Sequence, residues 1–351
     1  MHKKFLLSAL EQARLGQGFC APNPCVGAVA VQNGTIIAQA CHRGAGTPHA
    51  EQLLLAQIPP KTPGVSLYIS LEPCNHWGRT PPCVDAIINH GGIEHVIFAY
   101  CDPNPIVAQN NSSERLRSQG IQVTHYPMEE ITEFYQSYSH WTLTKKPWVT
   151  VKIAQTFNGK IGRATGERVV LSNDLCGEFT QRQRAAADII LTSARTVHLD
   201  NPKMNVRLKN TVQAKPVAII DRQLSLSKDA TIFSTASHCH IYHCDAHEAS
   251  YSNSSFHLMP TKNGTMDLSA VIGHLGELGY HDVWVEAGGA VFSTLHQEGL
   301  VHRTYLYLVP TVLEQSAVSA YQQSGIFNRA HRISWHAKGD NMIACIDWQE
   351  S

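Results

Sequence analysis

Three residues that can bind a metal ion, and one that can move a proton, lie in two short segments of the 351-residue sequence. The first segment is His49-Ala50-Glu51, and the second runs from Glu72-Pro73-Cys74 to Cys83. One imidazole and two thiolates supply three ligands of a tetrahedral Zn²⁺ site, which leaves the fourth position open for water. An open position is typical of a catalytic zinc site. The sequence therefore predicts His49, Cys74 and Cys83 as zinc ligands.

Glu51 is the predicted catalytic residue. It stands two positions from His49 and can therefore face the cavity without binding the metal. Zinc lowers the pKa of a bound water so far that hydroxide exists at neutral pH. A glutamate beside that water can take its proton and deliver protons to a ring nitrogen and to departing ammonia, which is the chemistry of zinc deaminases. His-Ala-Glu alone means little, and a lone cysteine is usually a core residue, so the combination carries the prediction.

The composition argues against several other classes of protein. Lys plus Arg and Asp plus Glu number 28 each, so the net charge is zero and gives no basic field for nucleic acid. Charged residues make up 16% of the chain and hydrophobic residues 43%, as in a globular protein with a full core. No signal peptide and no run of about 18 apolar residues is recognisable, so we expect a cytoplasmic protein without a membrane partner. Apart from Cys74 and Cys83, the cysteines are expected to be core thiols.

The spacing of apolar residues predicts elements that position the first motif. Up to residue 125 the expected order is a helix, a hairpin with Asn33-Gly34 at its turn, and then alternating helices and strands, which indicates a three-layer α/β domain. The expected helices are Lys3–Leu15, Ala50–Gln57, Val84–Asn89 and Ser113–Gln119. The expected strands are Val26–Val31, Thr35–Cys41, Val65–Leu71, His95–Tyr100 and Ile121–Thr124. His49 and Cys83 thus each precede a helix.

A second α/β pattern begins at Trp148, after a helical connector over residues 127–147. The sequence therefore predicts two domains, residues 1–145 and 146–351. Polar loops are expected at Ser252–Ser255 and Lys262–Gly264, and one or two closing strands in residues 316–351. The expected strands are Val149–Ala154, Ile189–Thr192, Val217–Asp221, His240–His243, Asp282–Glu286 and Tyr305–Val309. The expected helices are Asp174–Ala187, Leu268–Leu278 and Val291–Glu298.

Several segments of the first half carry a family resemblance. They are Pro22-Asn23-Pro24, Val26-Gly27, Gly46 to Glu51, Leu71 to Cys83 and Asp102-Pro103-Asn104-Pro105. In these segments the chain resembles the bifunctional riboflavin biosynthesis protein family, which joins a pyrimidine deaminase to a pyrimidine reductase. Eight residues separate Cys74 from Cys83, where other deaminases have Cys-x-x-Cys, and this insert is specific to the family. The resemblance implies a cytidine-deaminase-like domain that removes the ring 2-amino group of 2,5-diamino-6-(ribosylamino)-4(3H)-pyrimidinone 5′-phosphate.

The resemblance also implies residues that hold this substrate. Asn23, His42, His76 and Arg79 match family positions that contact the base or the ribose phosphate. Asn23 can equally form a turn, and the insert that carries His76 and Arg79 can simply close the pocket. The family's Gly-rich continuation after Pro105 is replaced here by Gln109-Asn110-Asn111-Ser112.

The second half is less specific when it is taken from its residues alone. It contains no G-x-G-x-x-G motif. The predicted strand that ends at Glu286 is followed by Ala287-Gly288-Gly289-Ala290 and a predicted helix, an arrangement in which free N–H groups can bind an anion. Two adjacent glycines are also typical of an ordinary strand-to-helix turn, so both interpretations stay open.

The resemblance continues through most of residues 148–315 and implies a dihydrofolate-reductase-like domain. The matching residues are Lys152-Ile153-Ala154, Gly159-Lys160, Gly166-Glu167, Leu191-Thr192, Thr196-Val197, Asp200, Pro202, Arg207 and Glu286. By this similarity NADPH lies along Thr196, Asp200, Arg222, Gly288 and Gly289, and carries the hydride that reduces the ribosyl chain to ribityl. The phosphosugar is held by Arg184, Asp200, Arg207 and Glu286, with the arginines as a fork on the phosphate. Either arginine can instead be a solvated surface residue.

Two departures leave an alternative open. The family's Ser-Leu-Asp-Gly is Thr156-Phe157-Asn158-Gly159 here, and its Ser-x-Trp-Ile-Thr-Gly is Arg168-Val169-Val170-Leu171-Ser172-Asn173. A deaminase joined to a non-catalytic or differently specific reductase-like domain is therefore the second hypothesis. A nucleic-acid deaminase would need a basic groove, and a structural zinc module a fourth protein ligand, so both are disfavoured. Family resemblance also suggests a homo-oligomer.

Overall fold

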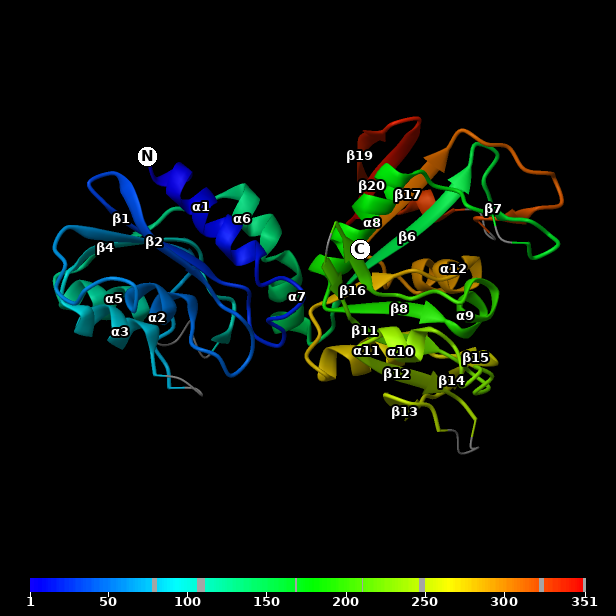
Figure 1. The fold of residues 1–351 in the computed structure, drawn as a ribbon, viewed down its shortest axis with the longest axis horizontal. Helices are drawn as coiled ribbons and strands as arrows, with labels where there is room; N and C mark the ends of the chain where they lie inside the picture. Colours follow the sequence, from blue (N-terminus) through cyan, green and yellow to red (C-terminus); the bar gives the residue numbers. More distant parts are fainter. Residues whose placement is uncertain are drawn as a thin grey trace. The chain divides into compact units, whose positions relative to one another are not determined.

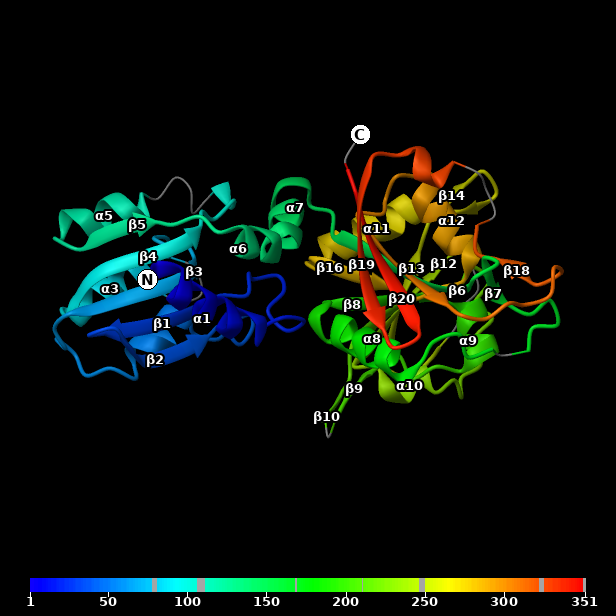
Figure 2. The same cartoon turned by 90° about the horizontal axis from the view of Figure 1, so that it is seen from above.

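The computed structural model of the chain describes residues 1–77, 81–105, 111–167, 169–209, 211–245, 250–321 and 325–349. The chain divides into two compact units, Met1–Lys145 and Lys146–Ser351. Figures 1 and 2 show the course of the chain through both units. Among the described residues, no helix combines the length and the apolar character needed to cross a membrane.

The N-terminal unit is built around a five-stranded sheet of order β2-β1-β3-β4-β5. β1 pairs antiparallel with β2 and β3, whereas β3, β4 and β5 run parallel. Its strands are β1 (Gly27–Gln32), β2 (Thr35–Cys41), β3 (Val65–Leu71), β4 (Ile93–Tyr100) and β5 (Gln122–His125). Its helices are α1 (His2–Arg14), α2 (Ala50–Leu55), α3 (Cys83–His90), α5 (Ser112–Ser118), α6 (Glu129–Phe134) and α7 (Gln136–Thr144).

Alternation along β1 explains the three layers of this unit. Successive side chains of a strand point to opposite faces of the sheet. Ala28 and Ala30 pack in the core beneath α2, α3 and α5, while Val29 and Val31 pack with α1, α6 and α7. Helices therefore cover both faces of the sheet, as Figure 1 shows.

The C-terminal unit contains a nine-stranded sheet of order β13-β12-β11-β8-β16-β6-β17-β20-β19. All neighbours from β13 to β17 are parallel, and β20 and β19 close the sheet as an antiparallel pair. The strands of this sheet are β6 (Trp148–Thr156), β8 (Ile189–Ser193), β11 (Pro216–Ile220), β12 (His238–His243), β13 (Ser254–Leu258), β16 (Asp282–Val285), β17 (Arg303–Val309), β19 (His331–Lys338) and β20 (Asn341–Trp348). Short strand pairs are β9 (Val206–Leu208) with β10 (Thr211–Gln213), β14 (Thr261–Lys262) with β15 (Thr265–Met266), and β7 (Lys160–Gly162) with β18 (Val318–Ser319).

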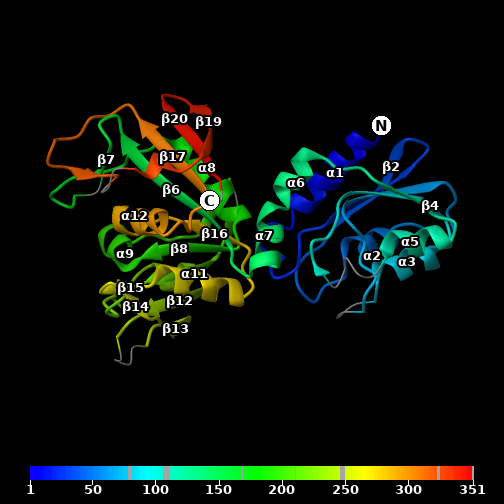
Figure 3. The same cartoon turned by 180° about the vertical axis from the view of Figure 1, so that it is seen from behind.

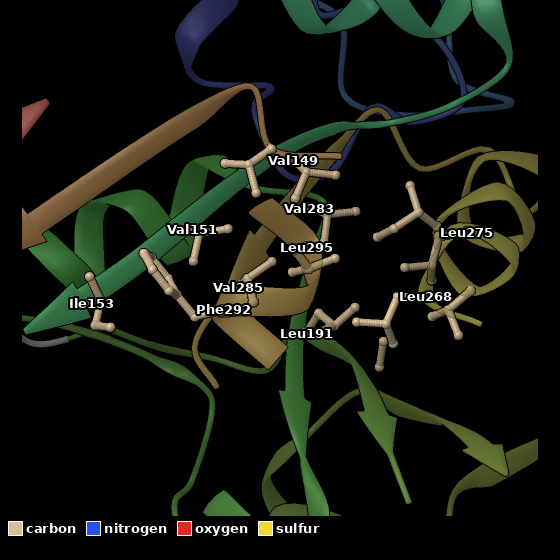
Figure 4. Packing of buried hydrophobic residues seen from close by; sticks show 14 of the residues in the cluster. Val149, Val151, Ile153, Leu191, Leu268, Leu275, Val283, Val285, Phe292 and Leu295 are labelled. Atoms are coloured by element: carbon tan, nitrogen blue, oxygen red, sulfur yellow. The ribbon is translucent and has the colours of Figure 1, made fainter. Parts of the chain in front are cut away.

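Helices also cover both faces of this larger sheet. They are α8 (Asp174–Ala186), α9 (Ala194–Asp200), α10 (Ile232–Thr235), α11 (Leu268–Glu277) and α12 (Gly289–Gln297), with a 3₁₀ turn at Ile326–Asn328. Figure 3 shows α11 and α12 beside the strands of this sheet. Val283 and Val285 of β16 point into a core shared with these two helices (Figure 4), and Trp284 points into the core beneath α8, α9 and α10. The alternation of β16 thus joins the sheet to both helical layers.

Most of the predicted elements are confirmed, with ends that differ by at most two residues. At the hairpin turn Asn33 and Gly34 have φ of 51° and 76°, the left-handed pair that a two-residue turn requires. The connector is helical as expected, but it forms α6 and α7 with Tyr135 between them. The two long strands β19 and β20 confirm the expectation for the C-terminal segment.

Two expectations for the C-terminal unit were incomplete or wrong. Ser252–Ser255 was expected to be a loop, but Ser254 and Ser255 begin β13, because backbone pairing with β12 organises a segment whose side chains are mostly polar. The sequence pattern also gave no sign of α9. Its start is specified by Ser193, whose hydroxyl accepts a hydrogen bond from the Thr196 backbone N–H.

Candidate active sites

The three predicted zinc ligands lie at the ends of elements that the sheet of the N-terminal unit brings together. His49 is the residue before α2, Cys74 follows β3, and Cys83 is the first residue of α3. Their ligand atoms lie within 4.8 Å of one another, the one such group among the described residues. His49 Nδ1 lies 3.6 Å from Cys74 Sγ and 3.3 Å from Cys83 Sγ. Zn–N and Zn–S bonds of normal length in a tetrahedron separate N from S by about 3.6 Å, so the three side chains fit the ion.

Charge at this site is set by the start of α3. The Cys83 backbone N–H points at Cys74 Sγ, at 3.4 Å. Hydrogen bonds from Cys83 and then from His49 lower the pKa of the Cys74 thiol to about 4, against the effect of burial. The neighbouring Cys74 thiolate and burial raise the pKa of Cys83. These hydrogen bonds favour the thiolate form of Cys74, which is the form that binds zinc.

Glu51 lies on the first turn of α2 and is 3% exposed. Its Oε2 has no hydrogen-bond partner among the described residues. Burial, followed by repulsion from Cys74, raises the pKa of Glu51 to about 6. An unpaired carboxylate whose pKa lies near neutrality is suited to taking up and releasing a proton.

These groups open into a cavity of about 380 Å³. The predicted substrate residues Asn23, His42 and His76 line this cavity together with His49 and Glu51. Asn23 Nδ2 lies 3.2 Å from His42 Nε2, and His42 Nδ1 lies 3.2 Å from the Pro48 carbonyl oxygen, so Asn23 and His42 brace each other. His76 Nδ1 is buried without a partner among the described residues. Arg79, the fourth predicted substrate residue, lies outside the described residues.

Other residues that line the cavity were not assigned a role from the sequence. They are, among others, Glu72, Asp102, Asn104 and Tyr138. Glu72, Asp102 and Asn104 belong to segments that resemble the family, so the signal was present but unused. Asp102 Oδ1 accepts hydrogen bonds from the Asn104 backbone N–H at 2.9 Å and from the Tyr138 hydroxyl at 3.0 Å. Tyr138 lies on α7, where no sequence motif marks it.

In the C-terminal unit, the predicted cofactor residues follow neighbouring parallel strands. Thr196 and Asp200 lie on α9 after β8, Arg222 comes just after β11, and Gly288 and Gly289 come after β16. Because β11, β8 and β16 are adjacent and parallel, these residues meet at the carboxyl edge of the sheet, where open α/β sheets bind ligands. A Cβ at Gly288 would meet no described atom within 4 Å, whereas one at Gly289 would approach Ile161 to 3.2 Å. Gly288 thus leaves the backbone open to a ligand, and Gly289 allows α12 to pack.

Two of the predicted substrate residues bind each other. The Arg184 Nε and Nη2 atoms donate to the two carboxylate oxygens of Glu286 at 2.6 and 2.9 Å, and Nη1 donates to the Asn205 carbonyl at 3.0 Å. The Trp284 indole N–H also donates to Glu286, at 2.7 Å. Burial opposes ionisation of Glu286, but Arg184 outweighs it and lowers the pKa of Glu286 to about 2. Arg184 was predicted to bind phosphate, but its guanidinium group binds the Glu286 carboxylate instead.

Arg207 is exposed on β9 and stays close to this pair. Its Nη1 donates to Asn205 Oδ1 at 2.5 Å, so Asn205 joins Arg184 to Arg207. Lys152 on β6 lies 5.1 Å above the Tyr307 ring. Burial, opposed by Glu286, lowers the pKa of Lys152. Arg207 is thus the member of the predicted arginine pair that can reach a ligand.

One of the departures from the family pattern has a structural reason. Asn158 Oδ1 accepts from the Thr156 hydroxyl at 2.6 Å, and Asn158 Nδ2 donates to the Leu313 carbonyl at 2.7 Å. A carboxylate could not make the second bond, so the amide ties the turn after β6 to the segment after β17. In the other departure, Val170 is 78% exposed and Asn173 caps α8 by accepting from Cys176 N–H. Arg168 lies outside the described residues.

Comparison with known proteins separates the two units in the same way. The cytidine and deoxycytidylate deaminase zinc-binding region matches residues 1–100, and the RibD C-terminal domain matches residues 147–343. The riboflavin biosynthesis protein RibD of Aquifex aeolicus is 32% identical over 89% of this chain and 87% of its own length. The Escherichia coli RibD protein is also 32% identical, over 89% of each chain. The chain belongs to the RibD family.

A crystal structure of the Thermotoga maritima family member agrees with this assignment. It has a TM-score of 0.89 and 27% identity, with 99% of both chains covered, and that protein is described as a diaminohydroxyphosphoribosylaminopyrimidine deaminase/5-amino-6-(5-phosphoribosylamino)uracil reductase. The resemblance drawn from the sequence is confirmed, as is the α/β fold with a cytidine-deaminase-like and a dihydrofolate-reductase-like part. The chain is an enzyme of riboflavin biosynthesis that has deaminase and reductase activities. Its cofactors are Zn²⁺ and NADPH.

Proposed function

We propose that residues 1–145 deaminate 2,5-diamino-6-(ribosylamino)-4(3H)-pyrimidinone 5′-phosphate and that residues 146–351 then reduce the ribosyl chain with NADPH. The observation that carries the first step is that His49, Glu51 and Cys74 line one cavity, with Cys83 close enough to share a metal ion with His49 and Cys74. The second step rests on family membership and on the cofactor and substrate residues at the carboxyl edge of the larger sheet. The substrate is the one that the family resemblance implies, and the two activities ascribed to the Thermotoga maritima protein agree with it.

In the proposed deamination, His49, Cys74 and Cys83 hold the zinc ion, which supplies a water acidic enough to attack a ring carbon at neutral pH. Oε2 of Glu51 takes a proton from the water and passes protons to the ring nitrogen and to the leaving amino group. Water and the amine become a carbonyl and ammonia, so the step needs no further reactant. Asn23, His42, His76 and Arg79 hold the base and the ribose phosphate.

In the proposed reduction, Thr196, Asp200, Arg222, Gly288 and Gly289 bind NADPH, which supplies the hydride. Asp200 and Arg207, both of which are exposed, hold the phosphosugar. Arg184 and Glu286 are assigned to the same substrate site. Because they are bound to each other, we propose that they act there as a pair, with Glu286 accepting from a sugar hydroxyl while Arg184 keeps it ionised. A cytoplasmic location and a homo-oligomer remain predictions.

Product analysis by mass spectrometry tests both steps. Without NADPH the zinc-loaded protein should release ammonia and the deaminated pyrimidine, and with NADPH it should form the ribityl product. Glu51→Gln should lower the rate of deamination at least about 100-fold. It should retain zinc and still reduce pre-deaminated substrate. Full deamination by Glu51→Gln would overturn the role of Glu51.

The exposed position of Val170 favours one alternative for the second unit. The family has a tryptophan here, and the 78% exposure of Val170 shows that valine packs little surface in its place. If NADPH does not bind in a fluorescence titration, or if deamination is the sole product with NADPH present, the second unit is a scaffold or acts on another substrate.

A further inference from the structure

The helical segment that follows the matched deaminase region reaches back into the deaminase cavity. The zinc-binding region of the family matches residues 1–100, and α7 begins only at Gln136. Tyr138 of α7 nevertheless lines the cavity and is 6% exposed. Sequence periodicity treats α6 and α7 as a connector. The structure makes α7 a wall of the site.

The hydroxyl of Tyr138 is hydrogen-bonded to another segment that lines the cavity, the one after β4. It donates to Asp102 Oδ1 at 3.0 Å, and the Asn104 backbone N–H donates to the same oxygen at 2.9 Å. Asp102 is itself 7% exposed, and both Asp102 and Asn104 line the cavity. Hydrogen bonds to a carboxylate are stronger than those between neutral groups. Tyr138 therefore restricts the rotation of Asp102 and holds the turn that carries Asn104.

Tyr135, the residue before α7, contacts the segment before β1, where Pro24 and Val26 line the cavity. Its hydroxyl donates to the Cys25 carbonyl at 2.8 Å and lies 2.6 Å from Ser70 Oγ. Ser70 Oγ in turn accepts the Gly27 backbone N–H at 3.0 Å. The Tyr135 and Tyr138 rings lie 6.4 Å apart. One side of the connector thus braces both the segment before β1 and the segment after β4.

We propose that Tyr138 is a positioning residue for the deaminase reaction, which acts by holding Asp102 and Asn104 against the bound substrate. This inference rests on the proposed deaminase function. Tyr138 does not act on the reacting atoms. Its hydroxyl fixes the side of the cavity that receives the substrate, so its loss should weaken substrate binding more than it slows the chemical step.

The test compares Tyr138→Phe with the wild type in the full-length, zinc-loaded protein. Phenylalanine keeps the ring in the core and removes only the hydroxyl. For Tyr138→Phe, kcat/KM of deamination should fall about tenfold, as expected for one hydrogen bond to a charged group, with most of the loss in KM. Zinc content and NADPH-dependent reduction of pre-deaminated substrate should match those of the wild type, and the thermal midpoint should stay well above the assay temperature. Tyr242→Phe is the matched control, since it removes a buried hydroxyl that contacts His274 Nδ1 at 3.0 Å in the other unit, and it should leave deamination unchanged.

The outcomes separate this proposal from the assignment beneath it. If the wild type does not deaminate the pyrimidine, the proposed function fails. If the wild type is active and Tyr138→Phe stays within twofold of its kcat/KM, the positioning role is overturned. A fall in activity that parallels a loss of zinc or of folded protein at the assay temperature would also overturn it, because Tyr138 would then only stabilise the fold. A loss confined to kcat would overturn the role in holding substrate. Calorimetric titration of the substrate is a second readout. The double variant Glu51→Gln, Tyr138→Phe should bind the substrate with a Kd about tenfold higher than that of Glu51→Gln alone.

Discussion

Glu51 and Glu286 are both largely removed from solvent, yet their carboxylates are held in opposite states. Glu51 has an oxygen without a partner among the described residues, and burial raises its pKa to about 6. Glu286 is bound at both oxygens by Arg184 and also by Trp284, and its pKa is lowered to about 2. Burial acts in the same direction on both groups, so the partners decide the difference. The first carboxylate is left able to exchange protons, and the second is fixed as an anion.

Removal of zinc tests the proposed role of Glu51 and should have the largest effect. Removal of zinc by a chelator should abolish deamination, because Glu51 then has no activated water to deprotonate. Reduction of pre-deaminated substrate by NADPH should continue, since the proposed reductase residues belong to the other unit. Added Zn²⁺ should restore deamination. Deamination that persists at background zinc, measured by atomic absorption, would contradict the metal assignment.

Arg184→Ala tests whether Arg184 stabilises the ionised form of Glu286 in the folded protein. It leaves the Glu286 charge in a largely buried position without its partner, so the C-terminal unit should lose about 3–5 kcal/mol of unfolding free energy. Urea unfolding followed by tryptophan fluorescence measures this loss. Arg182→Ala is the matched control on the same helix, because the Arg182–Glu178 pair is 66% and 45% exposed and its loss should lower the unfolding free energy far less. Equal effects of the two variants would show that the Arg184–Glu286 pair does not stabilise the unit.

A cluster of histidines in the C-terminal unit shows the effect of burial on groups that are positively charged when protonated. His240 Nδ1 lies 3.0 Å from His257 Nε2, and His240 Nε2 lies 3.1 Å from the Tyr280 hydroxyl. Burial, then repulsion from His238 and other neighbours, lowers the pKa of His240 to about 4. His257, which also faces His274, is lowered to about 4 in the same way. Both imidazoles are therefore neutral in the folded protein near neutral pH.

The sign of the pH effect follows from these lowered values. An unfolded histidine takes up a proton near pH 6.5, so stability is full above that pH and is lost as the pH falls toward 4. His240 alone should cost about 2 kcal/mol between pH 7 and pH 5. Urea midpoints across this range measure the slope. His240→Gln should flatten it, and His336→Gln on the exposed strand β19 should not. An unchanged slope in His240→Gln would show that other groups control it.

The effect of Glu51→Gln on stability should be the smallest, and it tests whether Glu51, unlike Glu286, contributes little to the stability of the fold. Glu51→Gln in the zinc-free protein should change the unfolding free energy by less than about 1 kcal/mol, because Oε2 has no hydrogen-bond partner among the described residues to lose. Chemical denaturation of the zinc-free variant and wild type in parallel gives this difference. A loss above about 2 kcal/mol would mean that Glu51 stabilises the fold and is not held there for chemistry.

Much of the fold could be predicted because local patterns in the sequence specify it. The alternation along β1 and β16, the Asn33-Gly34 turn and the helical periodicity of α1, α8 and α11 are all visible over a few residues. β13 was not predicted, because pairing with β12 organises a segment whose own side chains give a weak signal. The N-terminal site was predicted more fully than the C-terminal one. Metal ligands are restricted in type and spacing, whereas residues that bind a phosphosugar or a dinucleotide are common polar side chains.

Residue types and their spacing were enough to identify the family and to predict two domains, the metal ligands and the glutamate beside them. Long-range packing decided which polar groups would pair. Arg184 and Glu286 are 102 residues apart, and Asp102 and Tyr138 are 36 apart. No local periodicity links such residues, because their contact depends on which strands become neighbours and on where each strand ends. The same long-range packing leaves Glu51 Oε2 without a partner among the described residues and gives one to Glu286, and it makes α7 part of the deaminase cavity.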